Sequence, residues 1–219
     1  MIDTLKQILK KNCNPLIAHK QSKYMRNKFS FYGIPKPNLR QITKPFLQTS
    51  LLLSTSEIIE IVYQLFHENE REFHYIAIDL LTIHIHKFSY LNFQQLYLLI
   101  DLYPWWDSID SLQKPFSLWI IQHPDYLREV SLTWNNTNSI WQKRSAIILQ
   151  LKHKQNLDTS LLTEIIISNK NSSEFFIQKA IGWILREYSK INPWWIKEFI
   201  DQHKDLSNLS KKEGLKYIK

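Results

Sequence analysis

The spacing of apolar residues constrains this fold most, because it follows the period of an amphipathic helix through most of the 219 residues. The breaks between these stretches are short and carry Pro, Asn, Asp or Ser. They predict helices over residues 3–11, 15–28, 37–48, 55–66, 70–87, 92–102, 105–122, 124–134, 139–152, 159–168, 173–190, 193–202 and 207–218. We expect the helices that follow Asn14, Ser56, Asn92 and Asn192 to be capped by those side chains.

The longer predicted helices recur at a nearly constant interval. They begin near Glu70, Trp105, Ser139 and Ser173, about 35 residues apart, and alternate with shorter helices. This interval predicts one all-α domain over residues 1–219, in which stacked helix pairs form a curved solenoid with a concave, ligand-binding face. An irregular helical bundle is the alternative architecture.

Glycine and cysteine are both scarce, which excludes several classes of protein. The 3 glycines argue against sheets joined by tight hairpins, and against a glycine-rich loop for a nucleotide cofactor. With Cys13 as the only cysteine, neither an intramolecular disulfide nor a cysteine-based zinc site can form. No segment has the apolar run of a signal peptide or a membrane span, so we expect no membrane association and a cytoplasmic protein without cofactors.

The net charge of +8 is concentrated at the N-terminus. Residues 1–50 contain ten Lys or Arg against one acid, Asp3, and therefore carry +9, which leaves −1 for the remaining 169 residues. A basic end on a near-neutral body is typical of a protein that binds DNA or RNA, although a solvated basic surface has the same composition.

Residues 104–112, Pro-Trp-Trp-Asp-Ser-Ile-Asp-Ser-Leu, place two different stripes on one predicted helix. The apolar stripe should pack in the core and comprises Trp105, Ile109, Leu112 and Phe116. The neighbouring stripe, Trp106, Asp110 and Lys114, combines an indole with two charges. Because that combination is costly to bury, we expect this stripe to border solvent or a site.

Arg144 interrupts the apolar stripe of a later helix, which also contains Ile140, Ile147 and Leu151. A guanidinium in that position needs an acidic partner or an anionic ligand. A buried ion pair with Asp110 or Glu72 and a ligand contact are both consistent with the pattern.

Lys179, Trp183, Arg186 and Lys190 line one face of the helix predicted over residues 173–190. Three cations around an indole suit phosphates together with a sugar or base. A tryptophan packed by aliphatic lysine stems is the alternative interpretation.

Five runs, in the same order, resemble the AlkD family of DNA alkylation repair proteins over nearly the whole chain. These are Tyr24-Met25-Arg26-Asn27-Lys28-Phe29 with Gly33-Ile34, Arg71-Glu72-Phe73 with Ala77 and Leu80, Trp105-Trp106-Asp107-Ser108-Ile109-Asp110-Ser111, Trp141 with Arg144 and Ala146, and Phe175-Phe176-Ile177-Gln178-Lys179-Ala180-Ile181-Gly182-Trp183 with Leu185-Arg186-Glu187-Tyr188.

The resemblance implies a right-handed superhelix of degenerate HEAT-like helix pairs, a monomer that holds duplex DNA in its concave groove. The implied reaction is hydrolytic release of cationic N3- or N7-alkylated purines from that duplex, the first step of base excision repair. The family's catalytic aspartate falls on Asp110, its two sugar-contacting tryptophans on Trp106 and Trp183, and its groove arginine on Arg144.

Eight further side chains are expected to contact DNA: Lys23, Tyr24, Arg26 and Lys28 in the basic segment, and Lys114, Lys179, Arg186 and Lys190. The stretch Leu16 to Ser22 and the residues Pro35 and Lys36 are less like the family. The alternative function is therefore an inactive HEAT-like relative that binds DNA or a protein partner.

Other catalytic arrangements lack support in the sequence. His84 and His86, two residues apart, should point to different sides of a helix and cannot share a metal ion. No Ser, His and Asp grouping matches a local hydrolase motif.

Overall fold

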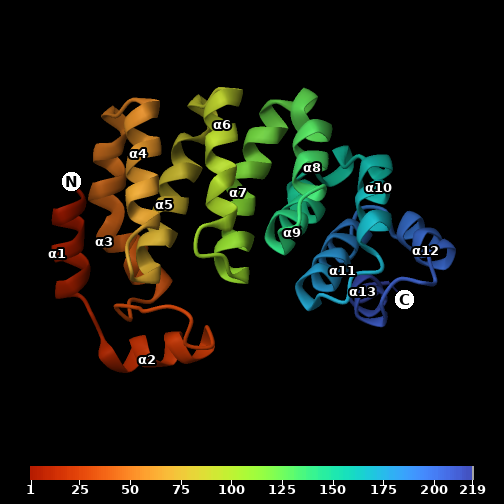
Figure 1. The fold of residues 1–219 in the computed structure, drawn as a ribbon, viewed down its shortest axis with the longest axis horizontal. Helices are drawn as coiled ribbons and strands as arrows, with labels where there is room; N and C mark the ends of the chain where they lie inside the picture. The colour runs from red at the N-terminus through yellow and green to blue at the C-terminus, as the bar shows by residue number, and fades with distance from the viewer. Residues whose placement is uncertain (219) are drawn as a thin grey trace. The chain divides into compact units, whose positions relative to one another are not determined.

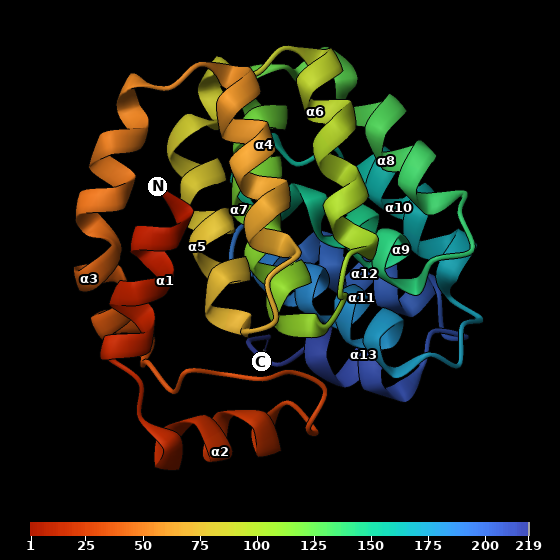
Figure 2. The same cartoon turned by 60° about the vertical axis from the view of Figure 1, so that its left-hand side comes forward.

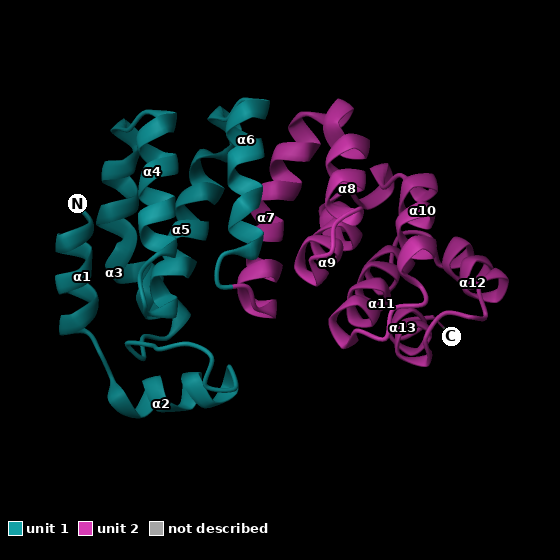
Figure 3. Cartoon of the chain, viewed as in Figure 1, with its two compact units in different colours: residues 1–103 teal, residues 104–219 magenta. Residues whose placement is uncertain are grey.

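The structure, a computed structural model, describes residues 1–218, and the regular elements in that range are α- and 3₁₀-helices, with a single isolated β-bridge between Ser30 and Glu70. The chain divides into two compact units, residues 1–103 and residues 104–219 (Figure 3). The predicted all-α class is confirmed. None of the described helices is both long and apolar enough to cross a membrane.

The first unit contains six α-helices, and the longest connection between them is the loop over residues 25–35 that joins α2 to α3 (Figure 1). They are α1 (Ile2–Lys11), α2 (Pro15–Tyr24), α3 (Lys36–Thr49), α4 (Thr55–Phe66), α5 (Arg71–His84) and α6 (Tyr90–Leu96). Short 3₁₀ segments, Ser50–Leu52, Ile85–Lys87 and Tyr97–Asp101, continue α3, α5 and α6. The core lies between α4 and α5, where Val62, Phe66 and Phe73 are fully buried.

Over residues 104–218, the second unit contains seven α-helices. They are α7 (Trp106–Gln122), α8 (Leu127–Asn135), α9 (Ile140–Ile148), α10 (Thr159–Asn169), α11 (Phe175–Ser189), α12 (Pro193–Gln202) and α13 (Asn208–Gly214). The apolar stripe predicted for α7 is buried and comprises Trp105, Ile109, Leu112 and Phe116. Helix α11 likewise buries an apolar stripe, which comprises Ile177, Ile181, Ile184 and Tyr188.

Two of the four predicted caps are confirmed and two are wrong. Asn14 and Asn192 accept backbone N–H bonds from the first turns of α2 and α12. The other two helices are capped by earlier serines, in capping boxes in which Ser54 pairs with Glu57 and Ser89 pairs with Asn92. Helix α4 begins at residue 55 as predicted, whereas α6 begins at Tyr90 and not at residue 92. A capping box requires an acceptor side chain three residues after the serine, and Glu57 and Asn92 stand at that spacing from Ser54 and Ser89.

The helix predicted over residues 15–28 ends at Tyr24. Arg26 and Asn27 adopt φ values of 56° and 55°, a left-handed conformation that an α-helix cannot continue through. The basic residues Arg26 and Lys28 therefore lie in a loop and not on α2.

Side-chain hydrogen bonds recur at the interval of the predicted repeat. Four pairs join residues 34 positions apart: Ser50–His84, Asp110–Arg144, Asn135–Asn169 and Lys179–Glu213. The first pair lies in the first unit and the other three lie in the second. This separation of 34 residues agrees with the interval of about 35 residues that the sequence predicts for the repeat.

Helix α2 lies across one end of the first unit in both views (Figures 1 and 2), and none of its residues is buried. The loop after it is fixed by the buried Glu72 carboxylate, which accepts hydrogen bonds from the backbone N–H groups of Tyr32, Gly33 and Ile34. Gly33 has φ +86°, and a Cβ there would lie 2.1 Å from the Asn14 carbonyl oxygen. Only glycine fits this close approach, which holds α2 against the loop.

Candidate functional site

The first turns of α7 present the mixed stripe identified in the sequence. Trp106 is the first residue of α7, and Asp110 follows one turn later, so the two side chains lie on one face of the helix. Both are half-buried, whereas Lys114, a further turn along, is exposed. The stripe therefore borders solvent, as predicted.

Arg144 of α9 forms a bidentate ion pair with Asp110. Its Nε donates to one carboxylate oxygen at 2.9 Å and its Nη2 donates to the other at 3.0 Å. Its Nη1 donates at 2.7 Å to the backbone carbonyl of Phe176 on α11. The acidic partner that the sequence required for Arg144 is thus Asp110, and the other candidate, Glu72, is bonded to backbone amides in the first unit.

The two members of this pair differ in exposure. The Arg144 side chain is 5% exposed and the Asp110 side chain 23%, so the arginine holds the carboxylate from the protein side while part of it faces solvent. Burial raises the pKa of the Asp110 carboxyl above its ordinary value, against the opposing effect of the Arg144 charge and hydrogen bonds. A carboxylate has about four acceptor positions, so the two bonds from Arg144 leave capacity for a further donor.

Aromatic rings surround the arginine. Its guanidinium carbon lies 5.9 Å from the ring centre of Trp183 and 5.9 Å from that of Phe176. Phe176 packs in turn against Trp105 and Trp141, at centroid distances of 5.4 and 5.0 Å. The structure therefore brings Asp110, Arg144 and Trp183 together from three helices, with Trp106 one turn from the aspartate.

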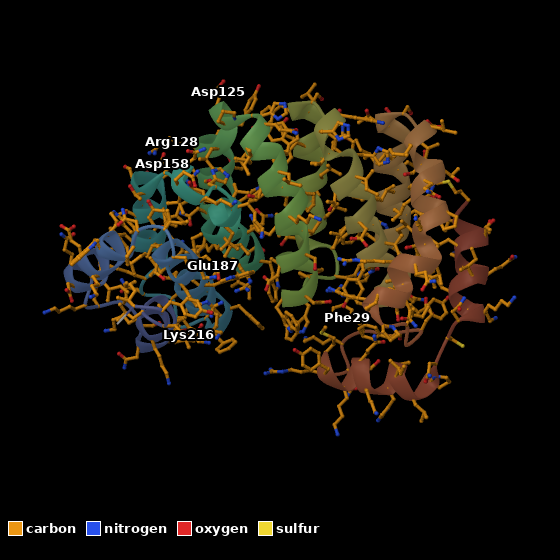
Figure 4. All side chains as sticks on the ribbon, turned by 180° about the vertical axis from the view of Figure 1, so that it is seen from behind. Phe29, Asp125, Arg128, Asp158, Glu187 and Lys216 are labelled. Carbon is orange, nitrogen blue, oxygen red and sulfur yellow. The ribbon has the colours of Figure 1, made fainter. Side chains whose placement is uncertain are left out.

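The cations predicted on α11 are present on the face that carries Trp183, but acids compensate them. Lys179 and Arg186 both bond to Glu213 of α13, at 2.9 and 2.6 Å. Lys190 bonds to Glu187 at 2.7 Å and lies 5.1 Å from the ring centre of Tyr217. Figure 4 labels Glu187 and Lys216, which mark this part of the second unit.

Sequence reasoning missed Glu213, since nothing near it in the chain marks it as functional. The signal that finds it is the repeat itself, because Glu213 follows Lys179 by the same 34 positions that separate Asp110 from Arg144. An acid one repeat after a cation on the same helix face is a candidate partner.

The basic residues at the N-terminus belong to the first unit. Lys23 and Tyr24 end α2, and Arg26 and Lys28 lie in the loop after it. All four are exposed, and Tyr24 reaches 70% exposure. These four residues are on the surface of the first unit, whereas Asp110 lies in the second.

His84 and His86 differ as predicted. His84 is fully buried, and its Nε2 lies 2.8 Å from the Ser50 hydroxyl, whereas His86 is exposed. Burial lowers the pKa of His84 to about 4, so the ring is neutral near pH 7.

Fold and site together define an all-helical repeat protein in which a partly exposed carboxylate is held by an arginine that lies beside Trp183. Residues 5–218 match the family model described as DNA alkylation repair enzyme, so the chain belongs to that family. The resemblance noted in the sequence is confirmed.

A solved structure described as a predicted DNA alkylation repair enzyme from Enterococcus faecalis is similar to this chain. The two sequences are 35% identical, the match covers 94% of this chain and 96% of the other, and the TM-score is 0.91. A comparison with curated proteins gave no match. Family and structural neighbour agree on a role in the repair of alkylated DNA.

Proposed function

We propose that this protein is a monofunctional DNA glycosylase that hydrolyses the N-glycosidic bond of cationic N3- or N7-alkylated purines in duplex DNA. The observation that carries the proposal is the Asp110 carboxylate, fixed by two hydrogen bonds from Arg144, partly open to solvent, and one turn from Trp106.

An N-alkylated purine already carries a positive charge and leaves without being protonated. The enzyme must therefore stabilise the positive charge that develops on the deoxyribose as the glycosidic bond breaks. Asp110 supplies negative charge for this purpose, and its free acceptor capacity allows it to orient the attacking water.

Arg144 is the positioning partner of Asp110 in this mechanism. Its Phe176 carbonyl bond and its near-complete burial fix the guanidinium, so the carboxylate keeps one orientation without reorganising during the reaction. The carboxylate is the more exposed of the two charges and therefore the closer one to a bound sugar.

The tryptophans and the basic residues complete the proposed DNA site. The electron-rich faces of Trp106 and Trp183 favour contact with a sugar that becomes cationic. Lys114, Lys179, Arg186 and Lys190 are proposed to contact phosphates near the lesion. Lys23, Tyr24, Arg26 and Lys28 are proposed to contact the duplex through the exposed surface of the first unit.

The second candidate function is DNA binding without excision. The bidentate geometry of the Asp110–Arg144 pair favours it, because a carboxylate in such a pair also serves as a structural contact.

One assay separates the two functions. Purified protein is incubated with duplex DNA that carries 7-methylguanine or 3-methyladenine, and free base is measured against a matched undamaged duplex. Release of either base above the spontaneous rate supports the glycosylase. Binding to the duplex with no release supports the inactive DNA-binding protein instead.

A further inference from the structure

Glu213 bridges two cations on the helix that carries Trp183. One carboxylate oxygen accepts from Lys179 Nζ at 2.9 Å, and the other accepts from Arg186 Nη1 at 2.6 Å. Two oxygens of one acid thus satisfy two donors that sit seven residues apart on α11, an arrangement that two oxygens of a phosphate would also satisfy.

The position of Glu213 is fixed by the packing of α13 on α11. A Cβ at Gly182 would lie 2.5 Å from the Glu213 Cβ and 3.2 Å from the Ser210 carbonyl oxygen, so glycine is required for this close approach. The Ser210 hydroxyl also donates to the Gln178 carbonyl at 2.8 Å. Such anchoring favours a permanent partner over one that a ligand displaces.

The bridge leaves the cluster of Lys179, Arg186 and Glu213 with a net positive charge and unused donors. The hydrogen bonds from Lys179, above all, lower the pKa of the Glu213 carboxyl, which is therefore ionised at neutral pH. The Lys179 ammonium retains two N–H donors beyond the bond to Glu213. Arg186 Nε lies 3.8 Å from Glu187 Oε1, and Glu187 Oε2 accepts from Lys190 Nζ at 2.7 Å. The three cations Lys179, Arg186 and Lys190 therefore share two acids, Glu213 and Glu187, and this face of α11 keeps a net positive charge.

We infer that Glu213 is a positioning residue for DNA, which orients Lys179 and Arg186 as a clamp for one backbone phosphate and cancels one of their two charges. The inference rests on the DNA binding in the proposed function. The negative charge of Glu213 lowers the affinity of this cluster for undamaged DNA. Its hydrogen bonds orient Lys179 and Arg186 so that their other N–H groups face a phosphate beside Trp183.

Duplex binding across a salt titration tests the clamp without any need for excision. Lys179→Met and Arg186→Met should each lower the slope of log affinity against log salt by about 1. Glu213→Gln should raise that slope by about 1 and tighten binding to undamaged DNA, because it releases a cation. The matched control is Glu164→Gln, which removes an acid bonded at 2.6 Å to Arg128, labelled in Figure 4, on other helices of the same unit. Slopes at the wild-type value in the two methionine variants, or equal slopes in the two glutamine variants, would overturn the inference.

Single-turnover excision tests whether Glu213 orients Lys179 and Arg186. Glu213→Gln should slow base release by about tenfold or more while binding more tightly, because the freed cations no longer hold one geometry. Glu164→Gln should keep the wild-type rate. In a Lys179→Met/Arg186→Met background, where Glu213 has neither cation left to orient, Glu213→Gln should cause no further slowing, whereas a residue that only braces α13 would give additive losses and contradict the clamp.

The two proposals fail in different ways. Wild-type protein that binds duplex DNA without releasing base removes the glycosylase, and the salt slopes then decide the clamp alone. Active wild-type protein with unchanged slopes in all variants removes the clamp and leaves the glycosylase standing.

Discussion

Arg71 in the first unit and Arg144 in the second share one bonding pattern but differ in surroundings. Each donates to the backbone carbonyl 32 residues further along, Arg71 to Tyr103 at 2.8 Å and Arg144 to Phe176 at 2.7 Å. Arg71 is fully buried, with its guanidinium 3.8 Å from the ring centre of Phe29, labelled in Figure 4, and 2.8 Å from His74 Nδ1. Arg144 instead holds a carboxylate that reaches solvent.

The difference separates what the helical repeat requires from what the proposed excision reaction requires. A buried arginine that ties one helix pair to the next is a structural device found in both units. In the second unit the arginine also pairs with Asp110, whose carboxylate is partly exposed. Variants of the two arginines and of their partners can therefore distinguish a structural position from a catalytic one.

The largest expected effect is on excision by Asp110→Asn. The change keeps the shape but removes the negative charge, so single-turnover excision should fall by about a hundred- to a thousandfold, or about 3 to 4 kcal/mol. DNA affinity should stay the same or rise slightly, because a carboxylate repels phosphates. Asp125→Asn, an exposed acid of the same unit, is the control and should keep its activity. If the Asp110→Asn enzyme kept full activity, Asp110 would not be catalytic, and Arg144 would have a structural role like that of Arg71.

Arg71→Met should reduce stability more than any comparable change of an exposed arginine. It leaves the buried His74 Nδ1 and the Tyr103 carbonyl without this donor, and the expected cost is about 3 kcal/mol in the free energy of unfolding. Arg128→Met, whose side chain is 59% exposed, should cost less than about 1 kcal/mol. Urea unfolding measures both, and equal costs would remove the structural role of Arg71.

Acid should destabilise the first unit through His84. Its pKa is about 4 in the folded protein against 6.5 ordinarily, so the unfolded chain binds the extra proton between these values. The free energy of unfolding should therefore fall as pH drops from about 6.5 towards 4, by on the order of 2 kcal/mol. In the His84→Gln variant the free energy of unfolding should fall less than in the wild type over this pH range. Identical pH profiles for variant and wild type would contradict the role of this ring.

The smallest expected effect comes from reversing charge in the basic segment. Changing Lys23, Arg26 and Lys28 together to Glu should weaken duplex binding by about tenfold at moderate salt and lower the salt slope. Damaged and undamaged duplexes should be affected alike, since phosphate contacts carry no information about the base. A loss confined to damaged DNA would instead assign these residues to lesion recognition.

Periodicity was sufficient to predict the helices and the buried stripes, because packing an amphipathic helix requires little beyond the spacing of apolar residues. It also marked Arg144 as needing an acid, which the structure identifies as Asp110. The end of α2 at Tyr24 was not predictable in this way, because Arg26 and Asn27 adopt positive φ without a glycine to signal it. Glu213 was missed for another reason, since its partners lie one repeat away and become apparent only when the helices are stacked.

The absence of buried side chains on α2 has an evolutionary consequence. This helix is held by the close approach of Gly33, by the amides bonded to Glu72, and by bonds from Gln21 and Ser22 to the loop backbone, so its other side chains contribute little to folding. Selection can therefore change the surface of α2 to suit a ligand while the rest of the unit stays as it is. The same independence makes α2 a natural place to graft new binding residues onto this scaffold.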